Sequence, residues 1–145
     1  MPDQAGAFRQ ATAGARILDG RDDRREFDKG HVARSLHAPL HGPFFSTAAG
    51  SYLVPDDRIL LVVENAADAE LAVLQLYRMG FDHVVGWIPV AEARAEGLLT
   101  TRLARQDFGD FRADQARKDG EILDVRTTAE FEKGHVDGAI SIPYT

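Results

Sequence analysis

The side chains of this 145-residue chain that could do chemistry come in two similar sets. Each set combines an aspartate, an arginine and a histidine, which could form an ion pair beside a general base. The members of the sets are Asp19, Arg21 and His31, and then Asp124, Arg126 and His135. His37 and His41 are four residues apart, a spacing that can bind zinc on a helix. They flank a proline and have no obvious third ligand, so we predict no metal site, and we also predict no cofactor.

The two sets belong to a longer internal repeat. Residues 17–40 are repeated by residues 122–145, with identical residues 104 or 105 positions apart. The matched pairs include Ile17 and Ile122, Phe27 and Phe131, Gly30 and Gly134, Val32 and Val136, and Pro39 and Pro143. A period this long is typical of a duplicated domain rather than of a solenoid. We therefore predict one domain over residues 1–103 and, over residues 104–145, the incomplete N-terminal part of a second domain.

Each copy predicts a strand, a short helix and a second strand. In the first copy, residues 16–19 form a short apolar run that ends in an acid. One of two consecutive aspartates, Asp22 or Asp23, can cap a helix that ends before Gly30. Residues 32–38 predict the second strand. No hairpin turn joins the two strands, so the connection is a crossover and the strands are parallel.

Strands and helices continue to alternate after this opening. Residues 59–63 are the most apolar run in the chain and predict a central strand. A helix follows, and its apolar face contains Ala69, Val73, Leu76 and Tyr77. Further predicted elements include a helix at 4–12, a loop with one helical turn at 42–51, a strand at 83–88 and a helix at 90–96. This alternation predicts a parallel sheet with helices on both faces.

These motifs resemble the N-terminal signature of the rhodanese-like domain family. The pattern is Leu-Asp-x-Arg, then Glu-Phe-x-x-Gly-His-Val, and then a small residue before Ile-Pro, and the second copy matches it nearly completely. The first copy departs from it at Gly20, Arg34, Ser35 and His37. The resemblance implies a rhodanese-like α/β fold, with a parallel five-stranded sheet flanked by helices on both faces.

The resemblance also implies a structural role for the signature residues. The histidine of each copy would hydrogen-bond backbone to fix a turn, and the Asp–Arg pair would hold the strand end against the neighbouring helix. The signature residues are Asp19, Arg21, Glu26, Phe27, Gly30, His31, Pro39, Asp124, Arg126, Glu130, Phe131, Gly134, His135 and Pro143.

The family consists of sulfurtransferases, and the resemblance places their active cysteine directly after the strand predicted at residues 59–63. The reaction needs a thiolate stabilised by converging N–H groups and nearby positive charge. Here the cysteine position falls on Val63 or Glu64, and further acids follow that would repel anionic sulfur donors. Asn65, with Asp68 three residues later, predicts an ordinary helix cap. The degenerate active-site loop consists of Val63, Glu64, Asn65, Ala66, Ala67, Asp68 and Ala69.

The composition excludes several classes of function and of partner. The chain has no cysteine, so we exclude cysteine-dependent sulfur transfer and the related phosphatase chemistry for the chain as given. A net charge of −6 argues against nucleic acid and anionic membranes as partners. The sequence has no secretory signal and no apolar run of membrane-spanning length, which predicts a cytoplasmic protein.

We therefore predict a catalytically inactive rhodanese-like module with a structural, regulatory or partner-binding role in a larger protein of sulfur metabolism. Tandem repeats whose first copy lacks cysteine resemble the C-terminal part of proteins that begin with a metallo-β-lactamase-fold domain. The alternative is a thiosulfate or persulfide sulfurtransferase whose cysteine lies in the second repeat, beyond residue 145. The predicted partner is a protein domain or subunit, with self-association through residues 110–145 as one form of it.

Overall fold

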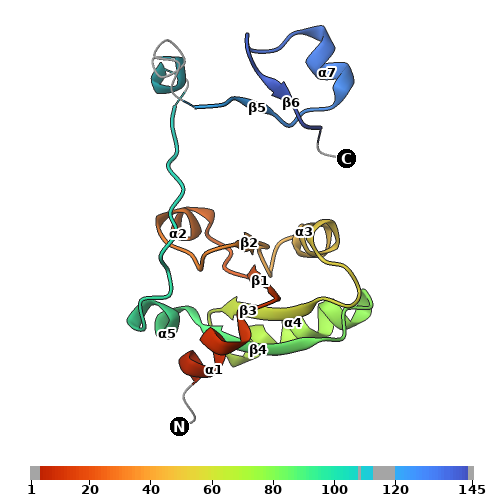
Figure 1. Ribbon diagram of the computed structural model, residues 1–145. Coiled ribbons are helices and arrows are strands. Elements are labelled where there is room, and N and C mark those ends of the chain that lie inside the picture. The colour runs from red at the N-terminus through yellow and green to blue at the C-terminus, as the bar shows by residue number, and fades with distance from the viewer. Residues whose placement is uncertain (1–3, 108, 113–119, 144–145) are drawn as a thin grey trace. The chain divides into compact units, whose positions relative to one another are not determined.

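The computed structural model describes residues 4–107, 109–112 and 120–143. The chain divides into two compact units, Met1–Ala104 and Arg105–Thr145, which we call unit 1 and unit 2 (Figure 1). Unit 1 contains a four-stranded sheet, and unit 2 contains a two-stranded sheet.

The sheet of unit 1 is parallel throughout, with the strand order β2-β1-β3-β4. Its strands are β1 (Ala15–Asp19), β2 (Ser35–His37), β3 (Arg58–Val63) and β4 (Val84–Pro89). Every residue of β3 after Arg58 is buried, as expected for an inner parallel strand that is covered on both faces. In the register of the sheet, Leu18 of β1 lies between Leu36 of β2 and Leu61 of β3.

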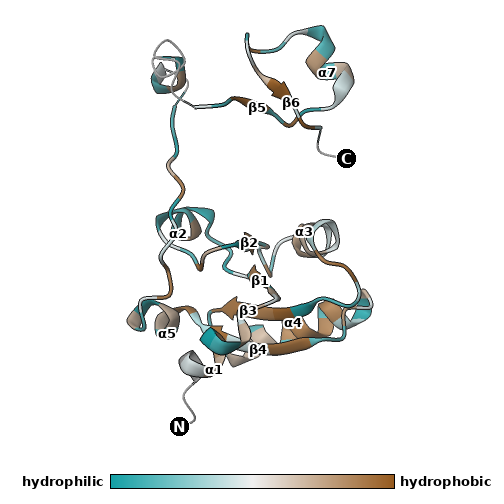
Figure 2. Cartoon of the chain, in the orientation of Figure 1, coloured by the Kyte–Doolittle hydropathy of each residue, from teal (hydrophilic) through white to brown (hydrophobic). Residues whose placement is uncertain are grey.

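Helices cover both faces of this sheet and enclose two apolar cores. They are α1 (Gln4–Ala11), α2 (Arg24–Lys29), α3 (Phe45–Tyr52), α4 (Ala66–Arg78) and α5 (Val90–Ala95). One core packs Leu18 and Leu61 against α3 and α4. The other core packs Ile17 and Leu60 against Phe8 of α1 and against α5. Neighbouring residues of one strand therefore enter different cores, as the pleat requires, and β3 and β4 stand out as apolar segments in Figure 2.

The prediction of a five-stranded sheet is wrong. After α5 the described chain of unit 1 makes only an isolated antiparallel bridge, in which His31 and Thr101 exchange both backbone hydrogen bonds. The second strand is also shorter than predicted and begins at Ser35 instead of residue 32. Arg34 explains this late start, because its φ of 66° places it in the left-handed region, where a strand cannot continue.

The segment predicted as a loop with one helical turn forms the eight-residue helix α3. Phe45 and Ala49, one turn apart, bury the same side of this helix in the core, and tertiary packing therefore stabilises it. The buried face of α4 also differs from the apolar face that was predicted for this helix. Ala69, Ala72 and Leu76 are buried, whereas Tyr77 is 66% exposed.

Unit 2 repeats the opening of unit 1 in its described part. It contains β5 (Leu123–Asp124), α7 (Thr128–Lys133) and β6 (Ile140–Ser141), with β5 and β6 paired in parallel. The N-caps are Asp23 for α2 and Thr127 for α7, which makes Asp22 the residue by which the first copy is longer.

None of the helices in the described part of the chain has the length and hydropathy of a membrane span.

The left-handed position before β2 gives a test of the fold. In the second copy the equivalent residue is Gly138, with a φ of 80°. We expect Arg34→Gly to raise the free energy of unfolding by about 0.5–1 kcal/mol, because relief of a left-handed residue is partly offset by the backbone entropy of glycine. The measurement is urea unfolding. Arg34→Ala removes the same charge but keeps Cβ, so a stabilisation as large in that variant would contradict the explanation.

Candidate functional site

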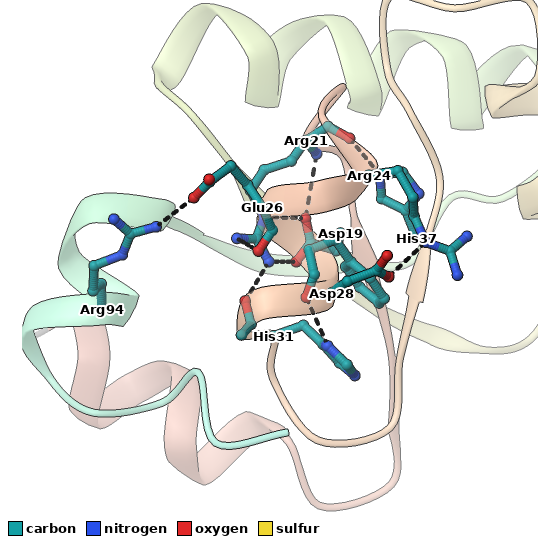
Figure 3. Close-up of polar contacts among 10 residues, drawn as sticks. Asp19, Arg21, Arg24, Glu26, Asp28, His31, His37 and Arg94 are labelled. Atoms are coloured by element: carbon teal, nitrogen blue, oxygen red, sulfur yellow. Dashed lines mark hydrogen bonds and ion pairs between the residues drawn. The ribbon is translucent and has the colours of Figure 1, made fainter. Parts of the chain in front are cut away.

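The signature residues of unit 1 converge on a buried ion pair at the end of β1. Arg21 Nε and Nη2 donate to Asp19 Oδ1 and Oδ2 over 2.9 and 2.6 Å, and neither side chain is more than 2% exposed (Figure 3). The same guanidinium donates to the backbone carbonyls of Glu26, in α2, and of Gly30, just beyond it. A bidentate pair with these additional acceptors satisfies charges that would be costly to bury alone.

His31 and Phe27 complete this cluster. Their rings stack with centroids 4.0 Å apart, and His31 Nδ1 lies 2.9 Å from the carbonyl oxygen of Phe27. A carbonyl only accepts, so Nδ1 carries the proton. The carboxylate of Glu26 contacts Lys29 and Arg94 on the surface, and Pro39 follows β2 after one residue. This contact pattern supports a structural role for the signature residues, which stays a prediction.

Unit 2 forms the same cluster at the surface. Arg126 Nη2 donates to Asp124 Oδ2 over 2.6 Å and to the carbonyl of Gly134 over 2.9 Å. His135 stacks on Phe131 at 3.7 Å and contacts its carbonyl oxygen at 2.9 Å. The remaining signature residues lie beside the cluster: Glu130 completes a capping box with Thr127, and Pro143 follows β6. The geometry therefore forms with or without burial.

The degenerate loop lies where β3 meets α4. Val63 ends the strand and is buried, whereas Glu64, Asn65, Ala66 and Ala67 are exposed. Asn65 caps α4 as predicted, because its Oδ1 accepts from the backbone N–H of Asp68 over 3.0 Å. The N–H of Ala69 donates to the Asn65 carbonyl as well. The cap therefore occupies the N–H of Asp68, one of the amides at this helix start that would otherwise be open to a bound anion.

The imidazole of His41 joins this loop to the loop after β1. Its Nδ1 lies 2.8 Å from Asp22 Oδ2, and its Nε2 lies 3.3 Å from Asp68 Oδ1. The backbone N–H of His41 also donates to Asp22 over 3.0 Å. Because the two ring nitrogens face two carboxylates, only the imidazolium satisfies both contacts. We call Asp22, His41 and Asp68 the His41 bridge.

Titration behaviour within the His41 bridge follows from these contacts. The hydrogen bond to Asp22, helped by the charges of Asp22 and Asp68, raises the pKa of His41 above its ordinary value of 6.5. Burial opposes ionisation of Asp22, but the hydrogen bonds from the backbone and ring of His41 outweigh it and lower the pKa of that carboxyl. The site at the carboxyl ends of the strands therefore holds two carboxylates and one compensating cation.

The His41 bridge was not predicted from the sequence, in which the spacing of His37 and His41 suggested only a zinc pair. His37 instead directs Nε2 to the carbonyl of Arg21 at 2.7 Å, and burial lowers the pKa of His37. Among the described residues, no group of three histidine, aspartate or glutamate side chains is arranged so that it could hold a metal ion. The signal that could have revealed the bridge is Asp22, the extra residue of the first copy.

A hollow in unit 1 lies away from the degenerate loop. It has a volume of about 430 Å³ and lies beside the start of β1, between α1 and the chain that follows α5. Its lining includes Phe8, Ile17, Val32 and Leu98. No residue of the degenerate loop lines this hollow.

The His41 bridge predicts a pH-dependent stability. A histidine whose pKa is raised by folding stabilises the fold fully below pH 6.5, and this contribution is lost as the pH rises through the raised pKa. We expect His41→Gln to lower the free energy of unfolding by about 0.2–1 kcal/mol at pH 5.5 and to have almost no effect at pH 8.5, since both partners are solvent-accessible. Urea unfolding at the two pH values measures this. Equal losses at both values, or an undiminished loss from His41→Gln in a chain that already carries Asp22→Asn, would contradict it.

Asp124 gives a second titration test, in unit 2. The side chain of Arg126, and then its backbone N–H, hydrogen-bond the carboxyl and lower its pKa from 3.8 to about 2. The pair therefore stabilises unit 2 above pH 3.8, and its contribution is lost as the pH falls toward about 2. We expect Arg126→Gln to return the pKa of Asp124 toward 3.8, as measured by NMR of the carboxyl carbon. Arg126→Lys, which keeps the charge but not the bidentate geometry, should give an intermediate value.

Comparison with known proteins supports the same fold. The family model described as "Rhodanese-like domain" matches residues 108–145. The crystal structure of the Rhodanese_3 like domain of the Alr3790 protein from Anabaena sp. is 25% identical, covers 65% of this chain and 98% of its own, and has a TM-score of 0.55. A second structure of the Alr3790 protein is 22% identical, covers 74% of this chain and 97% of its own, and has a TM-score of 0.60.

A longer protein shares the fold more distantly. Wild-type EanB is 14% identical over 98% of this chain and 39% of its own, with a TM-score of 0.53. Among curated proteins, none matches the chain in sequence. The chain thus has a rhodanese-like α/β fold, and its residues 108–145 match the rhodanese-like domain family.

Proposed function

We propose that this chain is a rhodanese-like module that does not itself transfer sulfur and that has a structural, regulatory or partner-binding role. The observation that supports the proposal is the short, capped connection Glu64–Asn65 between β3 and α4, where the family resemblance places the cysteine loop. The rhodanese family is a family of sulfurtransferases, and this chain has no cysteine.

The charge at this position supports the proposal. A transferable sulfur requires a thiolate, and its anionic form needs free N–H donors and positive charge nearby. Here Asp22 and Asp68 contribute carboxylates, and His41 lies between them with both ring nitrogens engaged. The N–H of Asp68 is already bound to Asn65. An anionic sulfur donor would have to displace the His41 bridge and would meet two carboxylates.

The biological setting is proposed by analogy. We place the module in a larger cytoplasmic protein of sulfur metabolism, in which it could accompany a metallo-β-lactamase-fold domain. Its partner would be a protein domain or subunit that contacts residues 110–145, or a second copy of this chain. The exposed apolar side chains of unit 2 support contact with protein. They are Leu123, Val125, Ile140 and Ile142.

A second candidate function is favoured by the family match itself. The matched residues are those of the second copy, 108–145, and not those of the first. Where the natural protein continues past residue 145, the second copy could carry a cysteine and act as a thiosulfate or persulfide sulfurtransferase. Unit 1 would then be a catalytically inactive domain of the same protein. A cysteine after the next strand of that copy, encoded downstream of residue 145, would favour this function.

The proposal is tested by thiosulfate-dependent formation of thiocyanate from cyanide. We expect the chain to give no thiocyanate above the blank. We also expect no turnover from Glu64→Cys, because the carboxylates of Asp22 and Asp68 disfavour a thiolate nearby and repel an anionic sulfur donor. Glu70→Cys, with an exposed thiol on α4, is the matched control for nonspecific thiol chemistry. Turnover by the unmodified chain would overturn the proposal. Turnover by the Glu64→Cys chain well above the control would show a functional cradle that lacks only its nucleophile.

A further inference from the structure

The hollow beside the start of β1 combines buried apolar side chains with exposed arginines. Its volume is about 430 Å³, and its lining includes Phe8, Ile17 and Val32, which belong to the second core of unit 1. Among the described residues that line it, two are arginines, Arg9 and Arg34, and none is acidic, although the chain has a net charge of −6. Sites for small molecules typically have volumes of about 300–1,000 Å³, so the hollow is large enough to be one.

The two arginines differ in what their guanidinium groups contact. Arg9 Nη2 donates to the backbone carbonyl of Glu96 over 2.6 Å and to its carboxylate over 3.2 Å. This pair joins α1 to the residue after α5 and neutralises the charge of Arg9. Within the described part of the chain, the guanidinium of Arg34 has no hydrogen-bond or ion-pair partner. Arg34 therefore leaves an uncompensated positive charge at the hollow.

The backbone of Arg34 is held in a conformation that favours glycine. The N–H of Ser35 donates to the carbonyl of Val32 over 3.0 Å and closes a turn. Arg34 is the third residue of this turn, and its φ of 66° is one that glycine or asparagine ordinarily supplies at that position. The second copy has Gly138 in the corresponding turn, with a φ of 80°. The arginine thus strains the backbone of the first copy, and strain of this kind clusters at ligand sites.

The chemistry of the lining selects one class of ligand. Its apolar side chains favour an apolar body, because contact removes that body from water. A guanidinium binds a carboxylate through two parallel N–H···O hydrogen bonds, and one free arginine matches a single negative charge. The hydroxyl of Thr12, which also lines the hollow, already donates to the carbonyl of Arg9 over 2.7 Å. Small inorganic anions such as sulfate are disfavoured, since the apolar walls offer no donors to their remaining oxygens.

We propose that this hollow binds a small monocarboxylate with an apolar body. The carboxylate pairs with Arg34, and the apolar body packs against Phe8, Ile17 and Val32. All described residues that line the hollow belong to unit 1, and none belongs to the degenerate loop. The inference therefore goes beyond the proposed function and does not depend on it.

The test is a titration of the whole chain with sodium octanoate at neutral pH, followed by the amide NMR signals. We expect the signals of residues 15–17, 32–34 and 97–100 to shift until the site is saturated. Octanol has the same apolar body without the charge, and we expect it to bind about tenfold more weakly, because it loses the charge-assisted hydrogen bonds to Arg34.

Three variants identify the contribution of Arg34. Arg34→Gln should weaken octanoate binding about tenfold and leave octanol binding unchanged, because it removes the charge and keeps Cβ. Arg34→Gly should weaken octanoate binding at least as much, although we expect this variant to be more stable, so its loss of binding cannot come from unfolding. Arg78→Gln is the matched control, since it removes an exposed arginine of α4, on the other face of the sheet, and should bind octanoate like the unmodified chain.

Any of three results would overturn the proposal. The first is the absence of a saturable shift of these signals up to millimolar octanoate. The second is equal affinity of the unmodified chain for octanoate and octanol, or equal affinity of the unmodified and Arg34→Gln chains for octanoate, because Arg34 would then not bind the carboxylate. The third is a saturable shift confined to α4 or to unit 2, which would place the octanoate outside the hollow.

Discussion

The bidentate ion pair between Asp19 and Arg21 fixes how the chain leaves the central sheet of unit 1. Both charges are buried, so loss of either partner would leave an unpaired charge in the core, at a cost of about 3–5 kcal/mol. Arg21 also holds the backbone of α2 through the carbonyls of Glu26 and Gly30. The direction set here places the next residue, Asp22, at the carboxyl ends of the strands, where it meets His41.

The same motif in unit 2 shows that the local geometry of the ion pair does not depend on burial. The contacts of Asp124 and Arg126 reproduce those of Asp19 and Arg21 almost atom for atom, although Arg126 is 47% exposed. The motif is therefore made by residues within one strand–helix turn and does not require a finished core. Burial changes how much the ion pair matters for stability. A solvent-exposed pair is screened and contributes little to the free energy of unfolding, whereas removal of one partner from a buried pair leaves an unpaired charge in the core.

At the connection from β3 to α4, where we propose that a cysteine loop has been replaced, unit 1 holds the carboxylates of Asp22 and Asp68. The start of α4 attracts negative charge because its N–H groups are unpaired in the helix, and the chain satisfies this preference internally with Asn65 and Asp68. The His41 bridge then compensates the carboxylates. The start of α4 is thus stabilised by contacts within the chain and without a ligand.

The sequence alone determined the features that depend on residues close together in the chain or on the periodic spacing of apolar residues. This includes the repeat, the parallel α/β class, the inner strand β3 and the Asn65 cap, because caps and apolar periodicity are local. Tertiary structure decided the rest. The fifth strand is reduced to one bridge at Thr101, α3 forms because Phe45 finds a core, and α4 buries Ala72 in place of Tyr77. The His41 bridge joins residues 19 positions apart that no local pattern connects, since only the folded sheet brings the ends of its strands to one edge.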